Sequence, residues 1–130
     1  FLNVKLPLLK KFTKERNLIA KYYNSNIPDL EDLILPYQAP QSYSVFHLYV
    51  IRTSKRNSLQ KYLTKKGIGT SIHYPIPPHL QEAYNELNFK KGSFPIAEKL
   101  ADTLLSLPLY PGLKRSDQDY IIEAITNFYK

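Results

Sequence analysis

The chain of 130 residues contains no cysteine, which excludes disulfide frameworks, thiolate nucleophiles and cysteine-ligated zinc sites. It has four glycines, too few to build the glycine-rich loops that cradle phosphate groups. No apolar run approaches the roughly 18–20 residues needed to cross a membrane, so we expect no membrane partner. Methionine is also absent, and the chain opens at Phe1 inside an apolar helical pattern without a capping residue before it. We therefore expect a piece of a longer protein.

The composition is typical of one folded domain. Two separate cores would each be too small to bury enough apolar surface, so we expect residues 1–130 to form a single unit. Hydrophobic residues make up 43% of the chain and charged residues 22%, which excludes intrinsic disorder. Eighteen lysines and arginines against eleven acidic residues give a net charge of +7. This charge favours an anionic partner, a class that extends from nucleic acid to a nucleotide diphosphate.

Hydrophobic periodicity predicts helices that alternate with short strands. Helices are expected at residues 2–23, 54–67, 79–87, 94–106 and 116–130, and strands at residues 44–53, 68–74 and 105–111. Pro7 should kink or start the first helix, and the proline-rich residues 24–41 should be extended, with brief edge pairing near residues 33–35. This order predicts an α/β two-layer fold, in which a small, mostly antiparallel sheet carries helices on one face.

Polar residues and glycine predict where the helices begin and end. Ser54 or Asn57 is a candidate cap for the second helix, and Gly67 supplies its left-handed stop. Ser116 is the expected N-cap of the last helix. The predicted buried stripe of that helix consists of Tyr120, Ile121, Ala124, Ile125 and Phe128.

No sequence motif for self-contained catalysis is present. The chain lacks GxxxxGK, GxGxxG after a strand, HExxH and GxSxG. Most acidic residues stand singly on helix faces, and the trio Asp29, Glu31 and Asp32 is interpreted as a solvated loop. We therefore predict that this chain does not assemble an active site by itself, with no catalytic residue and no metal site.

One dense constellation, residues 72–84, could carry ligand chemistry. His73 and Tyr74 end a predicted strand, and the prolines that follow them fix the backbone, so that His79 is displayed with little conformational freedom. Two imidazoles and a phenol could donate hydrogen bonds to an anionic ligand or move protons. They could equally be half-buried groups with ordinary structural partners. A metal pair would lack an evident third ligand.

For other polar residues, a structural or solvated role stands beside the possible functional role. His47 lies among apolar residues and is expected to be a satisfied core histidine. The basic cluster at the end of the first predicted strand could hold a phosphate or be only solvated; it consists of Arg52, Lys55 and Arg56. We interpret the basic residues on the outer face of the next helix as solvated; these are Lys61, Lys65 and Lys66. The eleven tyrosines raise the alternative of a stand-alone basic nucleic-acid-binding module. Their spacing argues against it, because Tyr22, Tyr62, Tyr84 and Tyr120 fall on apolar helix faces.

The order of three segments resembles the C-terminal part of the DegT–DnrJ–StrS aminotransferases. These segments are SVFHLYVIRT, GIGTSIHYPIPPHLQ and FPIAEKLADTLLSLPLYP. The resemblance implies that residues 1–130 are the small C-terminal domain of a fold type I enzyme that depends on pyridoxal phosphate. The lysine that binds this cofactor would lie in an N-terminal domain outside the chain, because no lysine here matches its motif. The fragment alone is then expected to bind no cofactor and to be inactive.

The resemblance also implies a substrate and partners. The complete enzyme would transfer an amino group, typically from glutamate, to a keto-sugar on a nucleotide diphosphate, in the cytoplasm, for amino-sugar or polysaccharide biosynthesis. His73, Tyr74 and His79 match family positions near the cleft and would bind the nucleotide sugar, whereas His47 would be structural. The chain would pack against its own N-terminal domain and a homodimer partner. A catalytically inactive relative that keeps the fold for sensing or assembly stays open.

Overall fold

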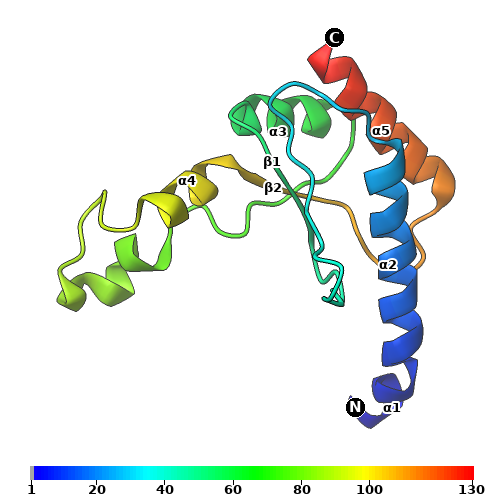
Figure 1. The fold of residues 1–130 in the computed structure, drawn as a ribbon, viewed down its shortest axis with the longest axis horizontal. Helices are drawn as coiled ribbons and strands as arrows, with labels where there is room; N and C mark the ends of the chain where they lie inside the picture. Colours follow the sequence, from blue (N-terminus) through cyan, green and yellow to red (C-terminus); the bar gives the residue numbers. More distant parts are fainter. Residues whose placement is uncertain (1) are drawn as a thin grey trace.

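The structure is a computed structural model, and it describes residues 2–130 (Figure 1). Two short strands lie among helices of different lengths. In the first half of the chain, the helices and 3-10 turns are α1 (Leu2–Lys5), η1 (Leu6–Leu8), α2 (Leu9–Asn26) and α3 (Arg56–Lys65). The later ones are η2 (Pro78–Leu80), η3 (Glu82–Leu87), α4 (Pro95–Thr103) and α5 (Arg115–Tyr129). The strands are β1 (Tyr49–Arg52) and β2 (Leu104–Leu107). Pro7 lies in η1, where it separates α1 from α2, as predicted.

The two strands form an antiparallel sheet. Tyr49 pairs with Leu107 and Arg52 with Leu104. Isolated bridges flank the sheet: Ile34 pairs with Arg52, which confirms the predicted edge pairing near residues 33–35, and Ser71 pairs with Ser106. The prediction of a small antiparallel sheet with helices is therefore confirmed.

Both predicted strands around this sheet are shorter than the sequence suggested, and the reason differs between the two sides of β2. In the observed registers Leu48 would face Pro108 on one side of β2, and Gly69 would face it on the other. Backbone bonds alternate in direction along β2: Ser106 bonds Ser71, so residue 108 would bond on the same side, and the missing N–H of Pro108 stops the pairing at Gly69. On the β1 side, Phe46 has φ +43°, outside the extended region, so the chain before β1 does not continue as a regular strand. The predicted strand 44–53 is reduced to β1, and the predicted strand 68–74 to the single bridge at Ser71.

One face of the sheet carries the core. Because side chains alternate along a strand, Tyr49 and Ile51 of β1 share a face with Leu105 and Leu107 of β2. All four are buried against residues of three helices: Ile19, Ala20 and Tyr23 of α2, Leu59 and Leu63 of α3, and Ile121, Ala124 and Ile125 of α5. The opposite face carries Val50, Arg52, Leu104 and Ser106, and we call it the open face.

The helix ends partly follow the predictions. Gly67 has φ +75° and ends α3 as expected. Neither Ser54 nor Asn57 caps α3; instead the Thr53 hydroxyl accepts the Lys55 N–H at 3.0 Å. Ser116 is not the N-cap of α5, because the helix already begins at Arg115 and Lys114 occupies the cap position without a side-chain bond. Tyr120, predicted to be buried, is exposed, whereas Ile121, Ala124 and Ile125 are buried.

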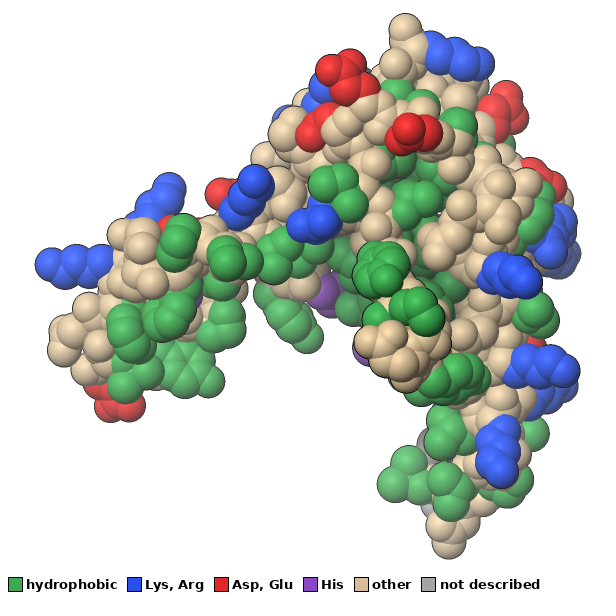
Figure 2. Space-filling model, viewed as in Figure 1, with side chains coloured by type: hydrophobic (Ala, Val, Ile, Leu, Met, Phe, Trp, Pro, Cys, Tyr) green, Lys and Arg blue, Asp and Glu red, His purple; other side chains and the backbone are tan. Residues whose placement is uncertain are grey.

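Between the Ser71 bridge and β2 the chain forms a projecting segment, residues 75–103, which we call the arm. It holds η2, η3 and α4 and extends away from the sheet, opposite the N-terminal half of α2 (Figure 1). The predicted helix 79–87 is present only as the two 3-10 turns, and α4 ends at Thr103 because Leu104 enters the sheet. Figure 2 shows a hollow between the arm and the rest of the molecule that hydrophobic side chains border on both sides. Within residues 2–130, no helix has the length and apolar character that a bilayer crossing requires.

Candidate functional site

His73 lies on the open face of the sheet, held by β2. Its Nδ1 is 2.9 Å from Oγ of Ser106, a residue only 4% exposed. The backbone holds the same pair of segments together, because Ser71 and Ser106 exchange both N–H···O bonds, at 3.2 and 2.8 Å. The half-buried imidazole is therefore fixed in position, with one ring nitrogen engaged.

Tyr74 stands beside this imidazole but is open to solvent. The peptide bond between His73 and Tyr74 is cis. The two rings meet edge to face, with centroids 5.7 Å apart and an interplanar angle of 87°. Tyr74 is 71% exposed, so its hydroxyl can meet a ligand or another part of the protein. His73 and Tyr74 stand next to each other here, and we call this pair the polar corner.

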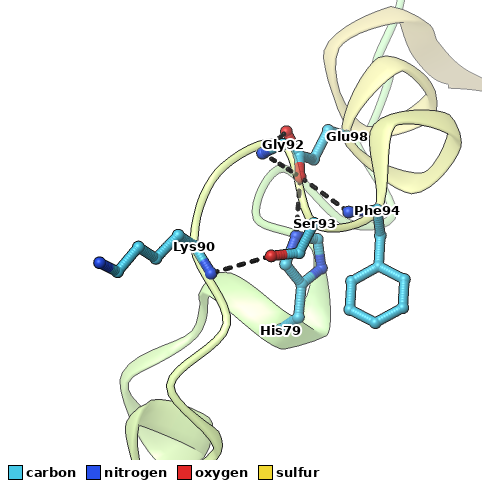
Figure 3. A network of polar contacts seen from close by, with 6 residues as sticks. All are labelled: His79, Lys90, Gly92, Ser93, Phe94 and Glu98. Atoms are coloured by element: carbon cyan, nitrogen blue, oxygen red, sulfur yellow. Dashed lines mark hydrogen bonds and ion pairs between the residues drawn. The ribbon is translucent and has the colours of Figure 1, made fainter.

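His79, the third predicted site residue, lies within the arm. Its Nε2 is 3.0 Å from Oε1 of Glu98 in α4, and the two side chains are only 8% and 12% exposed. The ring of Phe94 packs edge-on against the imidazole at 4.8 Å (Figure 3). In this structure His79 ties η2 to α4, while His73 is bound to the sheet.

Glu98 is the centre of the network in Figure 3. Its carboxylate accepts the N–H of Gly92 at 2.8 and 2.9 Å and the N–H of Phe94 at 3.3 Å, in addition to the contact with His79. These hydrogen bonds, led by the one from Gly92, lower the pKa of Glu98 below its ordinary value, because they stabilise the charged carboxylate. The network fixes the loop that precedes α4 and with it the shape of the arm.

The basic cluster at the end of β1 does not converge on one point. Arg56 is buried and donates from Nη1 to the carbonyls of Ala101 and Leu104, at 3.2 and 3.5 Å. Lys55 lies over the ring of Tyr129 at 5.3 Å. The interpretation of Arg56 as a phosphate ligand or solvated residue is wrong; it joins α3 to the base of the arm.

Two more sequence interpretations need correction. His47 is exposed and precedes β1, so it is not a core histidine; the strand begins too late to include it. Asp32 is not simply solvated, because its Oδ2 accepts the Thr53 hydroxyl, the Ser54 hydroxyl and the Ser54 N–H at 2.7–2.9 Å. These bonds, those from Ser54 and Thr53 first, lower the pKa of Asp32.

Several tyrosines that raised the nucleic-acid alternative already have partners. Tyr62 packs on Phe128 with ring centroids 5.4 Å apart. Tyr22 donates to Asp119 and lies under the guanidinium of Arg115, 3.3 Å from its carbon. The hydrogen bond to Asp119 raises the pKa of Tyr22. These rings serve the helix packing and are not displayed for base stacking.

Sequence reasoning missed Ser106 and Glu98, the two residues that hold the predicted histidines. A signal for Ser106 exists: it is the only polar residue in the apolar run LLSLPL, and a polar side chain in a buried strand needs a partner. Glu98 offers no such signal, because a glutamate in the first turn of a helix is ordinary.

Two observations on residues 2–130 bear on whether they could hold a cofactor or a metal. Every lysine in residues 2–130 is exposed, whereas a lysine that holds pyridoxal phosphate needs a pocket with partners for the phosphate and the ring. Over the same residues, no three histidine, aspartate or glutamate side chains gather as a metal would require.

Comparison with known proteins shows which protein family the chain belongs to. The sequence profile of the DegT/DnrJ/EryC1/StrS aminotransferase family matches residues 1–126, and the chain belongs to this family. It is 41% identical, over 99% of its length, to a protein of Geobacillus stearothermophilus named pleiotropic regulatory protein. It is 37% identical, over 98% of its length, to dTDP-3-amino-3,6-dideoxy-alpha-D-galactopyranose transaminase of Aneurinibacillus thermoaerophilus.

A solved structure matches the whole fold. DesV of S. venezuelae, crystallised in complex with a ketimine intermediate, superposes with a TM-score of 0.95 at 36% identity and covers 99% of this chain. The chain spans about a third of the length of these proteins: 35% of the Geobacillus protein, 34% of the Aneurinibacillus transaminase and 35% of DesV. It is therefore part of an aminotransferase-family protein.

Proposed function

We propose that residues 1–130 are the C-terminal small domain of a cytoplasmic, pyridoxal-phosphate-dependent aminotransferase of fold type I. The complete enzyme transfers an amino group from glutamate to a keto-sugar carried on a nucleotide diphosphate. Pyridoxal phosphate supplies the transamination chemistry, and residues outside this chain hold it. The domain alone is inactive.

The observation that carries this proposal is the family match over nearly the whole chain together with the superposition on DesV. Relatives that match most of this chain are named as transaminases of dTDP-linked amino sugars and as an aminotransferase of a UDP-linked sugar acid. A nucleotide diphosphate is anionic, and the net charge of +7 favours such a ligand.

The contribution of this domain is to bind the substrate. His73 is fixed on the open face of the sheet and Tyr74 is exposed next to it, so both can donate hydrogen bonds to phosphate or sugar oxygens. His79 contributes through the arm, whose conformation it fixes with Glu98, and reaches the substrate only by its remaining exposed edge.

The exposed apolar side chains are surfaces for the rest of the enzyme. Leu2, Val4 and Leu6 at the start of the chain are between 65% and 81% exposed, and Ile96 on the arm is 76% exposed. Isolated apolar residues are common on surfaces, but an apolar helix segment together with an apolar arm is typical of a contact surface. We assign these faces to the N-terminal domain and to the homodimer partner.

The test uses the full-length protein. It should show the absorbance band of bound pyridoxal phosphate and aminate a nucleotide-linked keto-sugar with glutamate. His73→Ala and Tyr74→Phe should each raise KM for the sugar nucleotide, whereas Tyr110→Phe, a matched change at an exposed tyrosine outside the corner, should leave it unchanged. Full-length protein without bound cofactor would contradict the proposal and favour the catalytically inactive relative.

A further inference from the structure

The hydroxyl of Ser106 occupies an unusual place in the sheet. The residue is 4% exposed, and its side chain points to the open face, away from the helices. Its backbone N–H and carbonyl both bind Ser71, two residues before His73, and its Oγ lies 2.9 Å from Nδ1 of that imidazole. One residue thus holds both the backbone and the ring of the polar corner.

The direction of this hydrogen bond follows from burial. A buried hydroxyl that does not donate its hydrogen leaves a polar group unpaired, which is costly and rare. Within residues 2–130, Nδ1 of His73 is the only acceptor that the structure places within hydrogen-bond distance of Ser106 Oγ. If Nδ1 carried the proton and donated it to Oγ, the hydrogen of the hydroxyl would have no acceptor. The hydroxyl therefore donates, and Nδ1 accepts.

We propose that Ser106 is a positioning residue that holds neutral His73 in the tautomer protonated at Nε2. His73 then meets its ligand as a hydrogen-bond donor at Nε2, and the ligand atom that it takes is an acceptor oxygen, such as a phosphate oxygen of a sugar nucleotide. The inference about the ligand rests on the proposed function; the inference about the tautomer does not.

The surroundings of the imidazole support this role. Tyr74 packs edge-on against the ring at 5.7 Å, so the ring is fixed by a hydrogen bond and by an aromatic contact. The Tyr74 hydroxyl has no protein partner among residues 2–130, and it is a second donor at the same corner. Two donors next to each other match an oxygen-rich anion better than they match a cation or a hydrogen-bond donor.

The first experiment measures the tautomer directly. Full-length protein with ¹⁵N-labelled histidine is studied by long-range ¹H–¹⁵N NMR, and His73 is assigned by loss of its signal in His73→Gln. We expect the signal of a protonated Nε2 and an unprotonated Nδ1. Ser106→Ala should shift His73 toward a mixture of tautomers, whereas Ser71→Ala, which removes the exposed hydroxyl of the bridge partner, should not. Ser106→Thr keeps the hydroxyl and should retain the wild-type signal.

The second experiment tests the donor at Nε2. The amide nitrogen of glutamine reaches the position of Nε2, whereas that of asparagine reaches only the position of Nδ1. Losing a hydrogen bond to a charged ligand reduces affinity roughly tenfold to hundredfold. We therefore expect His73→Asn to raise KM for the sugar nucleotide by about this factor, and His73→Gln to raise it less.

The outcomes are separable. Wild-type His73 protonated at Nδ1 would overturn the assignment of Ser106, even if the enzyme is an active aminotransferase. Equal KM values for His73→Gln and His73→Asn would overturn the donor role. A protein that binds no pyridoxal phosphate would contradict the proposed function, while the tautomer measurement would still decide on Ser106. If Ser106→Ala does not fold, the wild-type spectrum still tests the tautomer of His73, and the two His73 variants still test the donor role of Nε2.

Discussion

At the scale of single residues, Asp32 shows how one carboxylate joins distant segments. It accepts hydrogen bonds from Thr53 and Ser54 at the end of β1, and the Thr53 hydroxyl in turn accepts the Tyr129 hydroxyl at 2.7 Å. The proline-rich loop, the sheet and the last turn of α5 are thus connected through two side chains. Asp32 also has φ +66°, a conformation that asparagine adopts as readily as aspartate.

Asp32→Asn should reduce the stability of the fold near neutral pH, and the difference should disappear in acid. The pKa of Asp32 is lowered in the folded chain, so its stabilising effect is fully present above the ordinary value of 3.8. The effect is lost as the pH falls through the lowered pKa. Urea unfolding between pH 7 and pH 2 tests this, with Asp29→Asn in the same loop as the control. A constant difference between wild type and Asp32→Asn across that range would contradict it.

The polar corner was predictable from sequence to the extent that it depends on local order. His73 and Tyr74 could be singled out because they lie at the end of a predicted strand and directly before a segment with three prolines. The partners could not: Ser106 is 33 residues away from His73, and Glu98 is 19 residues away from His79. Which polar residues meet across such distances depends on strand register and on the path of the arm, and neither is visible in the periodicity of the chain.

At the scale of elements, the core is the most predictable part. Leu63 of α3 has no exposed surface, and it lies in the cluster formed with α5 and the sheet. Leu63→Ala should lower the free energy of unfolding by about 2–5 kcal/mol, because it removes buried methyl groups and leaves a cavity. Leu87→Ala in η3, where the side chain is 53% exposed, should change it by roughly 0.5 kcal/mol or less. Urea denaturation measures both; equal effects would contradict the observed packing.

The arm depends on polar contacts more than on apolar burial. Glu98→Gln should increase the hydrogen-exchange rates of the Gly92 and Phe94 amides, because a neutral amide accepts their hydrogen bonds less strongly than a carboxylate. Asp102→Asn, at an exposed position of the same helix, is the control. Acid should lower the protection of these two amides, measured against an unstructured amide at the same pH, because the lowered pKa of Glu98 means that the carboxylate is lost only below the ordinary value of 4.5. Unchanged exchange in Glu98→Gln would show that the carboxylate does not hold this loop.

Element types were more predictable than element lengths. The periodicity of residues 44–53 indicates a strand correctly, but only Tyr49–Arg52 pair, because Phe46 has φ +43° and leaves the extended conformation. Residues 79–87 have a helical apolar pattern, yet the chain forms only 3-10 turns there. The arm offers that segment no packed face against which a regular helix could bury its apolar side chains.

At the scale of the whole molecule, exposed apolar side chains gather near α1 and on the arm. If the faces near α1 and on the arm contact the rest of the enzyme, their amides should exchange more slowly in the full-length protein than in residues 1–130 alone. We expect a difference of about tenfold or more for Leu2–Leu8 and for α4. The amides of α3, which already pack on α5 within the domain, are the internal control. If the amides of Leu2–Leu8 and α4 exchange at the same rate in both proteins, these faces do not contact the rest of the enzyme.

The path of the chain into and out of the arm has a further consequence. Ser71 pairs with Ser106, and the Thr103 carbonyl accepts the Thr53 N–H at 3.0 Å, so the excursion leaves and rejoins the sheet at neighbouring points. Its length and sequence can therefore diverge during evolution without altering the register of β1 and β2. The shape of the arm and the register of the sheet are thereby encoded in separate stretches of one short polypeptide, and each can change with little effect on the other.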